Sequence, residues 1–192
     1  DLTIQPRIFT NNNLMLQSEY RQVEKNLNHI MDVAIFTSML NNNEESTKSH
    51  FFSNTVIDFD STFFETSDLE INIEQVTNDT YLKKFKPKSS LIVSENLMHS
   101  FFRYYGSEQN SSLEVSVESY EDLTKNSSDR YEYIYPNVEF NKEFGETNLP
   151  GSISLNSSLF QKQFDTNKTK QSLITDIIYT SDTSFNDIGL SN

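Results

Sequence analysis

The sequence lacks cysteine and tryptophan and has few glycines, prolines and positive charges. With no cysteine among its 192 residues, the chain forms neither a disulfide nor a thiolate metal site. Lysine and arginine together number 15 against 28 aspartates and glutamates, so the formal net charge is −13. Surfaces that bind nucleic acid need clustered lysine and arginine, and this balance therefore argues against a nucleic-acid partner.

Long apolar runs are absent as well. The longest weakly polar stretch, 30–40, contains Asp32, Thr37 and Ser38, and a membrane helix needs about 18 to 20 consecutive apolar residues. Membrane-spanning β-strands stay open, because their signal per strand is much weaker. The hydrophobic content of 35% is lean for a packed core, yet 15 Phe and 9 Tyr are too many for a disordered acidic chain. The apolar residues are therefore expected to form one thin hydrophobic layer.

What the sequence does contain is alternation of apolar and polar residues. Leu69, Ile71 and Ile73 alternate with Glu70, Asn72 and Glu74. An extended strand would be apolar on one face and wet on the other, whereas a helix would scatter these residues all round. The segment 69–75 is therefore predicted to be a strand, and similar units separated by polar breaks recur along the chain.

The repeating pattern predicts ten or eleven strands and no amphipathic helix with caps. The segment 29–38 is apolar on both faces, but its β-branched content favours a strand over a helix. Pro6 places the first strand at an edge or a bulge, and Pro136 bends or ends the first half of its strand. The segments 87–94 and 97–105 are predicted to form a hairpin. Further strands are expected over 1–9, 14–21, 51–60, 113–118, 131–135, 152–160 and 172–179.

Candidate catalytic groups are sparse. The histidines, His29, His50 and His99, have no second histidine or carboxylate at metal-ligand spacing, and we interpret them as loop or strand-surface residues. The acidic pairs are read as solvated charges, because proximity in sequence does not establish active-site geometry. These pairs are Glu44–Glu45, Asp58 with Asp60, and Glu121–Asp122. The chain is accordingly predicted not to be an enzyme and to need no cofactor or metal.

Several stretches together resemble one family, the lipopolysaccharide-assembly protein LptD of the outer membrane. An aspartate-led alternating strand is followed by a Glu-Tyr-Arg strand, then by an Asn-Asp-Thr-Tyr-Leu segment, a Tyr-Glu-Asp-Leu segment, an aromatic-Pro strand and a Gly-Ser strand. These motifs lie at 1–9, 16–21, 78–85, 120–123, 133–138 and 149–155, in the order in which the family has them. Asn and Lys replace residues that are usual at many positions of better-known members.

The resemblance implies an all-β fold, an antiparallel up-and-down outer-membrane β-barrel located in the cell outer membrane. Residues 1–192 would form its N-terminal part, with the periplasmic jellyroll and the closing strands absent. Implied partners are lipopolysaccharide, an LptE-like lipoprotein plug inside the barrel, a periplasmic LptA-like bridge reached through the missing domain, and outer-membrane lipids.

The barrel interpretation assigns a face to each strand residue. Side chains opposite the apolar positions would point into a wet lumen; the candidates are Glu70, Asn72, Glu74, Glu114 and Glu118. Two other classes stay open on pattern alone. One is a soluble β-sandwich adhesin or binding module, and the other is a porin-like diffusion channel. A translocon depends on detergent for solubility, whereas a soluble β-sandwich module does not. A lateral seam and a plug partner distinguish a translocon from a porin-like channel.

Overall fold

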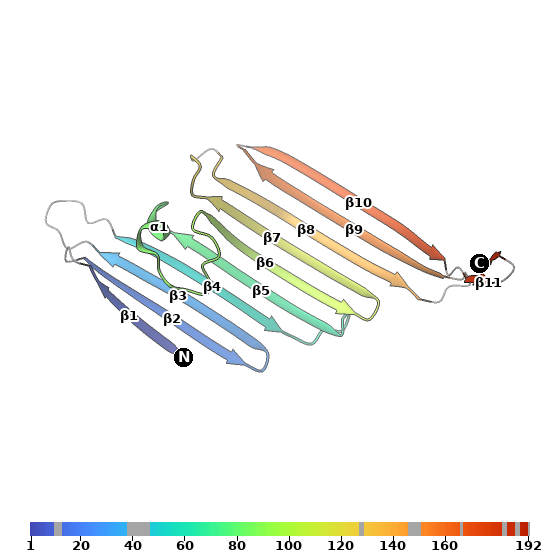
Figure 1. Cartoon of the computed structure of the whole chain (residues 1–192), viewed down its shortest axis with the longest axis horizontal. Coiled ribbons are helices and arrows are strands. Elements are labelled where there is room, and N and C mark those ends of the chain that lie inside the picture. Colours follow the sequence, from blue (N-terminus) through green and yellow to red (C-terminus); the bar gives the residue numbers. More distant parts are fainter. Residues whose placement is uncertain are drawn as a thin grey trace.

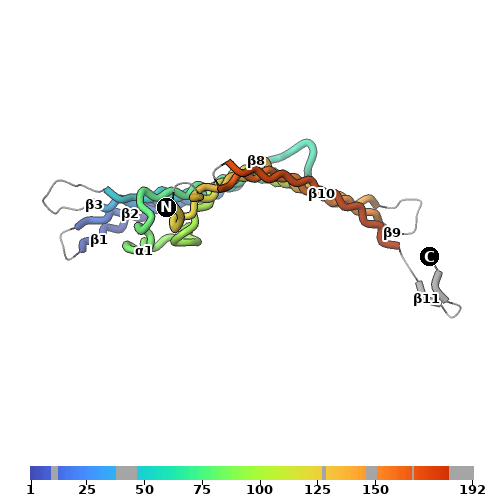
Figure 2. Tube along the Cα trace, turned by 90° about the horizontal axis from the view of Figure 1, so that it is seen from above, coloured from blue at the N-terminus to red at the C-terminus, as the bar shows by residue number. Residues whose placement is uncertain are grey.

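The computed structural model describes residues 1–9, 13–37, 47–126, 129–145, 151–165, 167–181, 184–186 and 189–191. Ten strands form one antiparallel sheet in which each strand pairs with its neighbours in the sequence, and β1 and β10 lie at the two edges (Figure 1). Seen edge-on, the sheet is a single curved layer (Figure 2). The predicted all-β, up-and-down antiparallel fold is confirmed, and the sheet is not closed into a barrel.

The strands of the sheet are long. They are β1 Leu2–Ile8, β2 Leu14–Glu24, β3 Leu27–Thr37, β4 Lys48–Asp58, β5 Thr66–Val76, β6 Leu97–Glu108, β7 Ser111–Asp122, β8 Tyr131–Phe144, β9 Gly151–Phe164 and β10 Lys168–Ser181. A separate short hairpin joins β11 Ser184–Asn186 to β12 Gly189–Ser191. The predicted strand over 29–38 is confirmed as β3, and the alternating segment 69–75 lies inside β5.

Pro6 and Pro136 act as expected. Pro6 lies in β1, an edge strand that pairs with β2 alone. At Pro136 the register of β8 against β9 shifts between Ile134 and Asn137, and the Tyr135–Pro136 peptide is cis. Proline lacks the N–H that a ladder needs, so it is accommodated at an edge or at an irregularity.

The predicted hairpin of 87–94 with 97–105 is wrong. Residues 77–96, which we call the cap, connect β5 to β6 as the short helix α1 (Tyr81–Phe85) and irregular chain, and β6 pairs with β5 and β7 instead. Pro87 lacks a ladder donor, and the apolar residues of α1 gain more by packing on the sheet than by alternating along a strand. The expectation of no amphipathic helix fails at α1 for the same reason.

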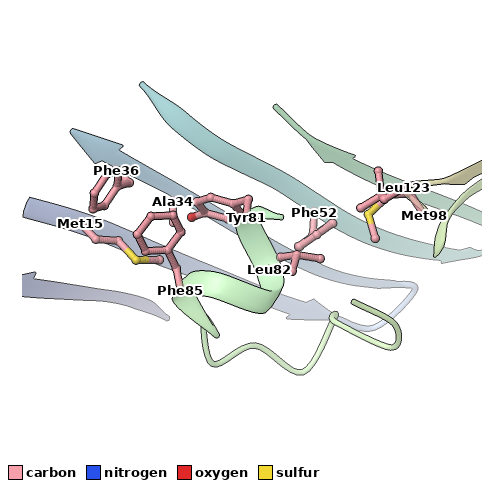
Figure 3. Packing of buried hydrophobic residues seen from close by; sticks show 9 residues of the cluster. All are labelled: Met15, Ala34, Phe36, Phe52, Tyr81, Leu82, Phe85, Met98 and Leu123. Carbon is pink, nitrogen blue, oxygen red and sulfur yellow. The ribbon is translucent and has the colours of Figure 1, made fainter. Parts of the chain in front are cut away.

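The helix α1 is short but well defined. Its C-cap is Lys86, which has the left-handed conformation (φ 42°, ψ 58°) and donates its N–H to the carbonyl of Leu82 at 2.9 Å. Lys83 and Lys84 in its last turn complement the helix dipole. Its buried residues Tyr81, Leu82 and Phe85 point toward the sheet (Figure 3).

The main hydrophobic core lies between the cap and the sheet (Figure 3). Phe85 packs against Phe36 with ring centroids 4.2 Å apart, and the ring centroid of Tyr81 lies 5.2 Å from that of Phe85. The buried apolar residues of this cluster are Met15, Ala34, Phe36, Phe52, Tyr81, Leu82, Phe85, Met98 and Leu123. Its sheet residues Met15, Ala34, Phe36 and Phe52 share the side of the cap, so this part of the core covers one face near one end of the sheet.

The two faces of the sheet differ in chemistry. Directly paired residues share a face, so the ladder places Glu70, Asn72 and Glu74 on the side that the cap covers, and Leu69, Ile71 and Ile73 on the other. We call the first the polar face and the second the apolar face. Strand β10 departs from the pattern, because Ile174 and Ile178 lie on the polar face.

The apolar face carries large exposed side chains from edge to edge. Ile4, Leu16, Val117, Leu173 and Ile177 are between 48% and 75% exposed. Its Asp, Glu, Lys and Arg residues in β1–β10 lie at or near strand ends; they are Glu24, Glu108, Glu121 and Lys142. At one end, the β4–β5 connection lays Phe64 against Gly106, where a Cβ would lie 2.5 Å from the Phe64 ring. The described chain places no second layer over the rest of this face.

Candidate functional site

The five residues expected to line a lumen lie on the polar face. Register pairs Glu70 with Arg103 across β5 and β6, and Glu118 with Phe101 across β6 and β7, which sets both carboxylates on the side of the cap. Alternation along each strand puts Asn72, Glu74 and Glu114 there too. The structure therefore brings Glu70, Asn72, Glu74, Glu114 and Glu118 together on one surface.

Arg103 is the centre of this surface. Its guanidinium lies 3.2 Å from Glu70 and 3.4 Å from Glu114, so one cation of β6 bridges carboxylates on β5 and β7. It also lies over the ring of Phe101, 4.4 Å from the centroid. Asn54 on β4 donates to Glu70 at 2.9 Å. The sequence pattern indicated the carboxylates but not the arginine that partly neutralises them.

A second group of contacts lies nearer the cap. His99 stacks on Tyr120 with ring centroids 4.1 Å apart, and its Nε2 lies 3.1 Å from Glu118. Tyr120 donates its hydroxyl to Glu118 at 2.7 Å. Glu74 accepts the backbone N–H of His99 at 2.9 Å. His99 is thus a partner of two carboxylates, which its spacing in the sequence did not predict.

These side chains form the floor of a cavity of 380 Å³ under the second half of the cap. Leu91, Val93 and Leu97 give it an apolar wall, and the carboxylates and amides of the polar face give it a polar one. The lining is Asn54, Glu70, Asn72, Glu74, Ser90, Leu91, Val93, Ser94, Leu97, His99, Phe101 and Tyr120. Such a cavity suits an amphipathic group better than a purely charged one.

A buried polar cluster holds the cap at Tyr81 and Lys88. Nε2 of His50 lies 3.1 Å from Asp32, and its Nδ1 lies 3.2 Å from the hydroxyl of Tyr81 in α1. Gln17 donates its amide to Asp32 at 2.8 Å and to the carbonyl of Lys88 at 2.9 Å. We call Gln17, Asp32, His50 and Tyr81 the clamp, because they join β2, β3 and β4 to the cap.

The clamp has the residue types of a proton relay, but its side chains are closed off from solvent and substrate. The side chains of Asp32 and His50 are fully buried, and the ring of Phe52 stacks on His50 at 4.7 Å. Burial raises the pKa of Tyr81 because the phenolate is disfavoured away from water, and the charge of Asp32 adds to this effect. A substrate cannot reach these groups without displacing α1. The chemistry of the clamp is therefore to pin the cap.

A surface ion pair links the start of the cap to the β7–β8 connection. Arg130 lies 2.6 Å from Asp79 and 2.7 Å from Glu121. The guanidinium holds the pKa of Asp79 below its ordinary value, because the pair favours the charged carboxylate. Two carboxylates likewise raise the pKa of Arg130.

The remaining sequence candidates do not converge. His29 lies on the apolar face beside the hydroxyl of Thr55, 2.8 Å away, far along the sheet from His50. Asp58 pairs with Asp68 across β4 and β5, Asp60 lies in the following connection, and Asp122 ends β7. Glu44–Glu45 lies outside the described residues. Within the described ranges, no three His, Asp or Glu side chains are placed to share a metal ion.

Comparison with protein-family models and with curated proteins gave no match for this chain. In the part of the chain that the structure describes, no helix has the length and apolar character needed to cross a membrane.

Proposed function

We propose that the chain forms part of the wall of an LptD-type outer-membrane translocon, which moves lipopolysaccharide into the outer leaflet of the outer membrane. In this assignment the apolar face contacts lipid and the polar face lines the lumen. The chain does no catalysis; it offers a polar surface and a seam past which an amphipathic lipid moves. An LptE-like plug and lipopolysaccharide are its proposed partners.

The observation that carries the proposal is the exposed apolar face. A soluble protein rarely exposes a contiguous apolar patch of more than a few hundred Å². Here Ile4, Leu16, Val117 and Leu173 belong to a face that runs across all ten strands, and its charged residues keep to strand ends. Such a face is stable in hydrocarbon, where a charged residue at mid-depth is costly.

Strand length supports the same assignment. Strands β2 to β10 have between 11 and 14 residues, and a tilted membrane strand needs about 9 to 11. Strands of soluble domains commonly have about five or six. In lipid the backbone groups of β1 and β10 need partners, because open sheet edges do not occur there. The proposal therefore requires further strands beside both edges.

The alternatives fit less well. A β-sandwich would cover its apolar face with a second sheet, and the described chain places only the β4–β5 connection over one end of that face. A porin-like channel shares the sheet and the polar face. It differs in having no need to bind lipopolysaccharide or a plug.

The test is lipid-phase labelling of single cysteines introduced at positions 69 to 74 of the full-length protein in liposomes. A membrane-restricted reagent is expected to label cysteine at 69, 71 and 73 but not at 70, 72 and 74. Labelling of the even positions, equal labelling, or a full-length protein that stays in solution without detergent would each refute the proposal. Co-purification of lipopolysaccharide and of a lipoprotein with the tagged protein separates a translocon from a porin.

A further inference from the structure

We propose that the exposed face of the cap binds phosphate groups of a glycolipid through Lys83, Lys84, Lys86 and Lys88, which we call the basic strip. The inference rests on the proposed function, because it assigns a contact surface to the translocated lipid. Four of the chain's 15 basic residues fall within these six positions. Each of the four residues is exposed, whereas Tyr81, Leu82 and Phe85 between and before them are buried against the sheet.

The basic strip stands out because four lysines fall within six positions and none of them has a counterion. Within the described ranges, no carboxylate lies within 4 Å of these four lysines or of Arg7, Lys25, Lys48, Lys142 and Lys170. The other six cations have such partners: Arg21, Arg103, Arg130, Lys125, Lys162 and Lys168. Arg7 adds a fifth positive charge beside the strip, since its guanidinium donates to the carbonyls of Phe85 and Lys86. An acidic chain that leaves its densest cation cluster unpaired presents a local positive field.

The strip is also held rigidly. The clamp fixes Tyr81 from below, Gln17 holds the carbonyl of Lys88, and Lys86 has a defined left-handed backbone conformation. Cations mounted on a fixed backbone lose less conformational freedom on binding than cations on a mobile loop. The buried polar cluster thereby gains a role: it positions the basic strip above the sheet.

Position favours a lipid over other anions. The cap lies on the polar face, at the end of the sheet where the connections 38–47, 77–96 and 123–130 join the strands, whereas none of the connections at the other end, 25–26, 59–65, 109–110 and 145–150, has more than seven residues. Outer-membrane barrels carry their longer loops outside the cell. Under the proposed function the strip therefore faces the lumen near the outer leaflet. The net charge of −13 repels a nucleic acid as a whole, but a compact phosphate group meets only the strip, because salt screens the rest over about 8 Å.

The experiment measures binding of bisphosphorylated lipid A to the full-length protein in detergent micelles at several salt concentrations. The test variant is Lys83→Gln, Lys84→Gln, Lys86→Gln and Lys88→Gln together. A matched control replaces four exposed lysines elsewhere and lowers the net charge by the same amount. These lysines are Lys25, Lys142, Lys168 and Lys170. A third variant replaces the four cap lysines by arginine and keeps the charge.

The cap glutamine variant is expected to bind at least about tenfold more weakly and with a shallower salt dependence, because several exposed ion pairs act together. The control variant and the arginine variant are expected to bind within about twofold of the parent, since neither loses a cation of the strip. Dephosphorylated lipid A should bind the parent and the cap variant equally, and equimolar inorganic phosphate should displace no lipid.

Several results would overturn the inference. Equal weakening in the cap and control variants would show a non-specific charge effect, and unchanged binding in the cap variant would show that the strip makes no contact. Displacement by inorganic phosphate would assign the strip to the free ion. If the parent itself binds no lipid A, the proposed substrate fails as well. Normal binding by the parent together with an unaffected cap variant removes only the inference.

Discussion

At the scale of single residues, the most constrained group is the buried pair of Asp32 and His50. Both side chains are out of contact with water, and each satisfies the other across β3 and β4. Removing one partner of a buried pair leaves the other uncompensated, which destabilises a protein far more than loss of a surface pair. The clamp is therefore where a single change most affects the cap.

His50→Ala is expected to lower the free energy of unfolding by roughly 3 kcal/mol, because the buried carboxylate of Asp32 loses its histidine partner and keeps the hydrogen bonds of Gln17 and Ser89. Tyr81→Phe should lower it by about 1 kcal/mol, because the ring stays packed and one hydrogen bond is lost. Urea titration of the full-length protein folded in micelles, followed by fluorescence, measures both. A larger loss for Tyr81→Phe than for His50→Ala would contradict this account of the clamp.

At the scale of elements, the cap depends on contacts with β2, β3 and β4 and with the β7–β8 connection. The clamp supplies the buried contacts, and the pair of Asp79 with Arg130 supplies an exposed one. Exposed pairs contribute little at neutral pH and are screened by salt. Their titration nevertheless gives the cap a distinctive pH dependence.

The pKa of Asp79 is lower in the folded chain than in the unfolded chain because of Arg130. The pair therefore stabilises the fold fully above the ordinary carboxylate pKa of about 3.9, and this contribution is lost as the pH falls through the lowered value. Asp79→Asn should reduce protection of the α1 amides from hydrogen exchange at pH 6 but not at the acidic limit. An effect of Asp79→Asn that does not change with pH would argue against the ion pair.

At the scale of the whole molecule, the asymmetry of the sheet decides which substitutions a membrane tolerates. Ile71 belongs to the apolar face, and Asn72 belongs to the polar face, where it donates to the carbonyl of His99 at 2.7 Å. Both positions lie in the middle of β5. Neighbouring residues of one strand therefore report on the two environments of the sheet.

Ile71→Arg is expected to lower the free energy of unfolding in phosphatidylcholine vesicles by roughly 2 to 4 kcal/mol, because the new charge faces hydrocarbon near the midplane of the bilayer. Asn72→Arg should cost much less, since Glu70 and Glu74 lie on the same face. The two variants are compared by denaturant titration of the full-length protein reconstituted in vesicles. Similar losses at both positions would argue against a lipid-facing apolar face.

The sequence alone determined most of the strands and the faces of β5 and β7. Strict alternation from Leu69 to Glu74 fixes which side chains of this strand lie on each face, because a shift of one residue moves every side chain to the opposite face. The same alternation set Glu114 and Glu118 opposite the apolar residues of β7. Pro6 and Pro136 marked an edge and an irregularity, because a missing N–H has local consequences that need no tertiary contact.

Only the tertiary structure decided what the cap does. Five residues of helix make no periodic pattern, and α1 forms because Leu82 and Phe85 find an apolar surface on strands far away in the sequence. Asp32 and His50 meet because β3 pairs with β4, and Tyr81 joins them because the cap folds back onto the sheet. These residues are far apart in the sequence, so their spacing gives no sign of the contact. Local alternation encodes a sheet with two faces, whereas long-range packing chooses which part of the polar face is covered and where the lysines of the cap are held.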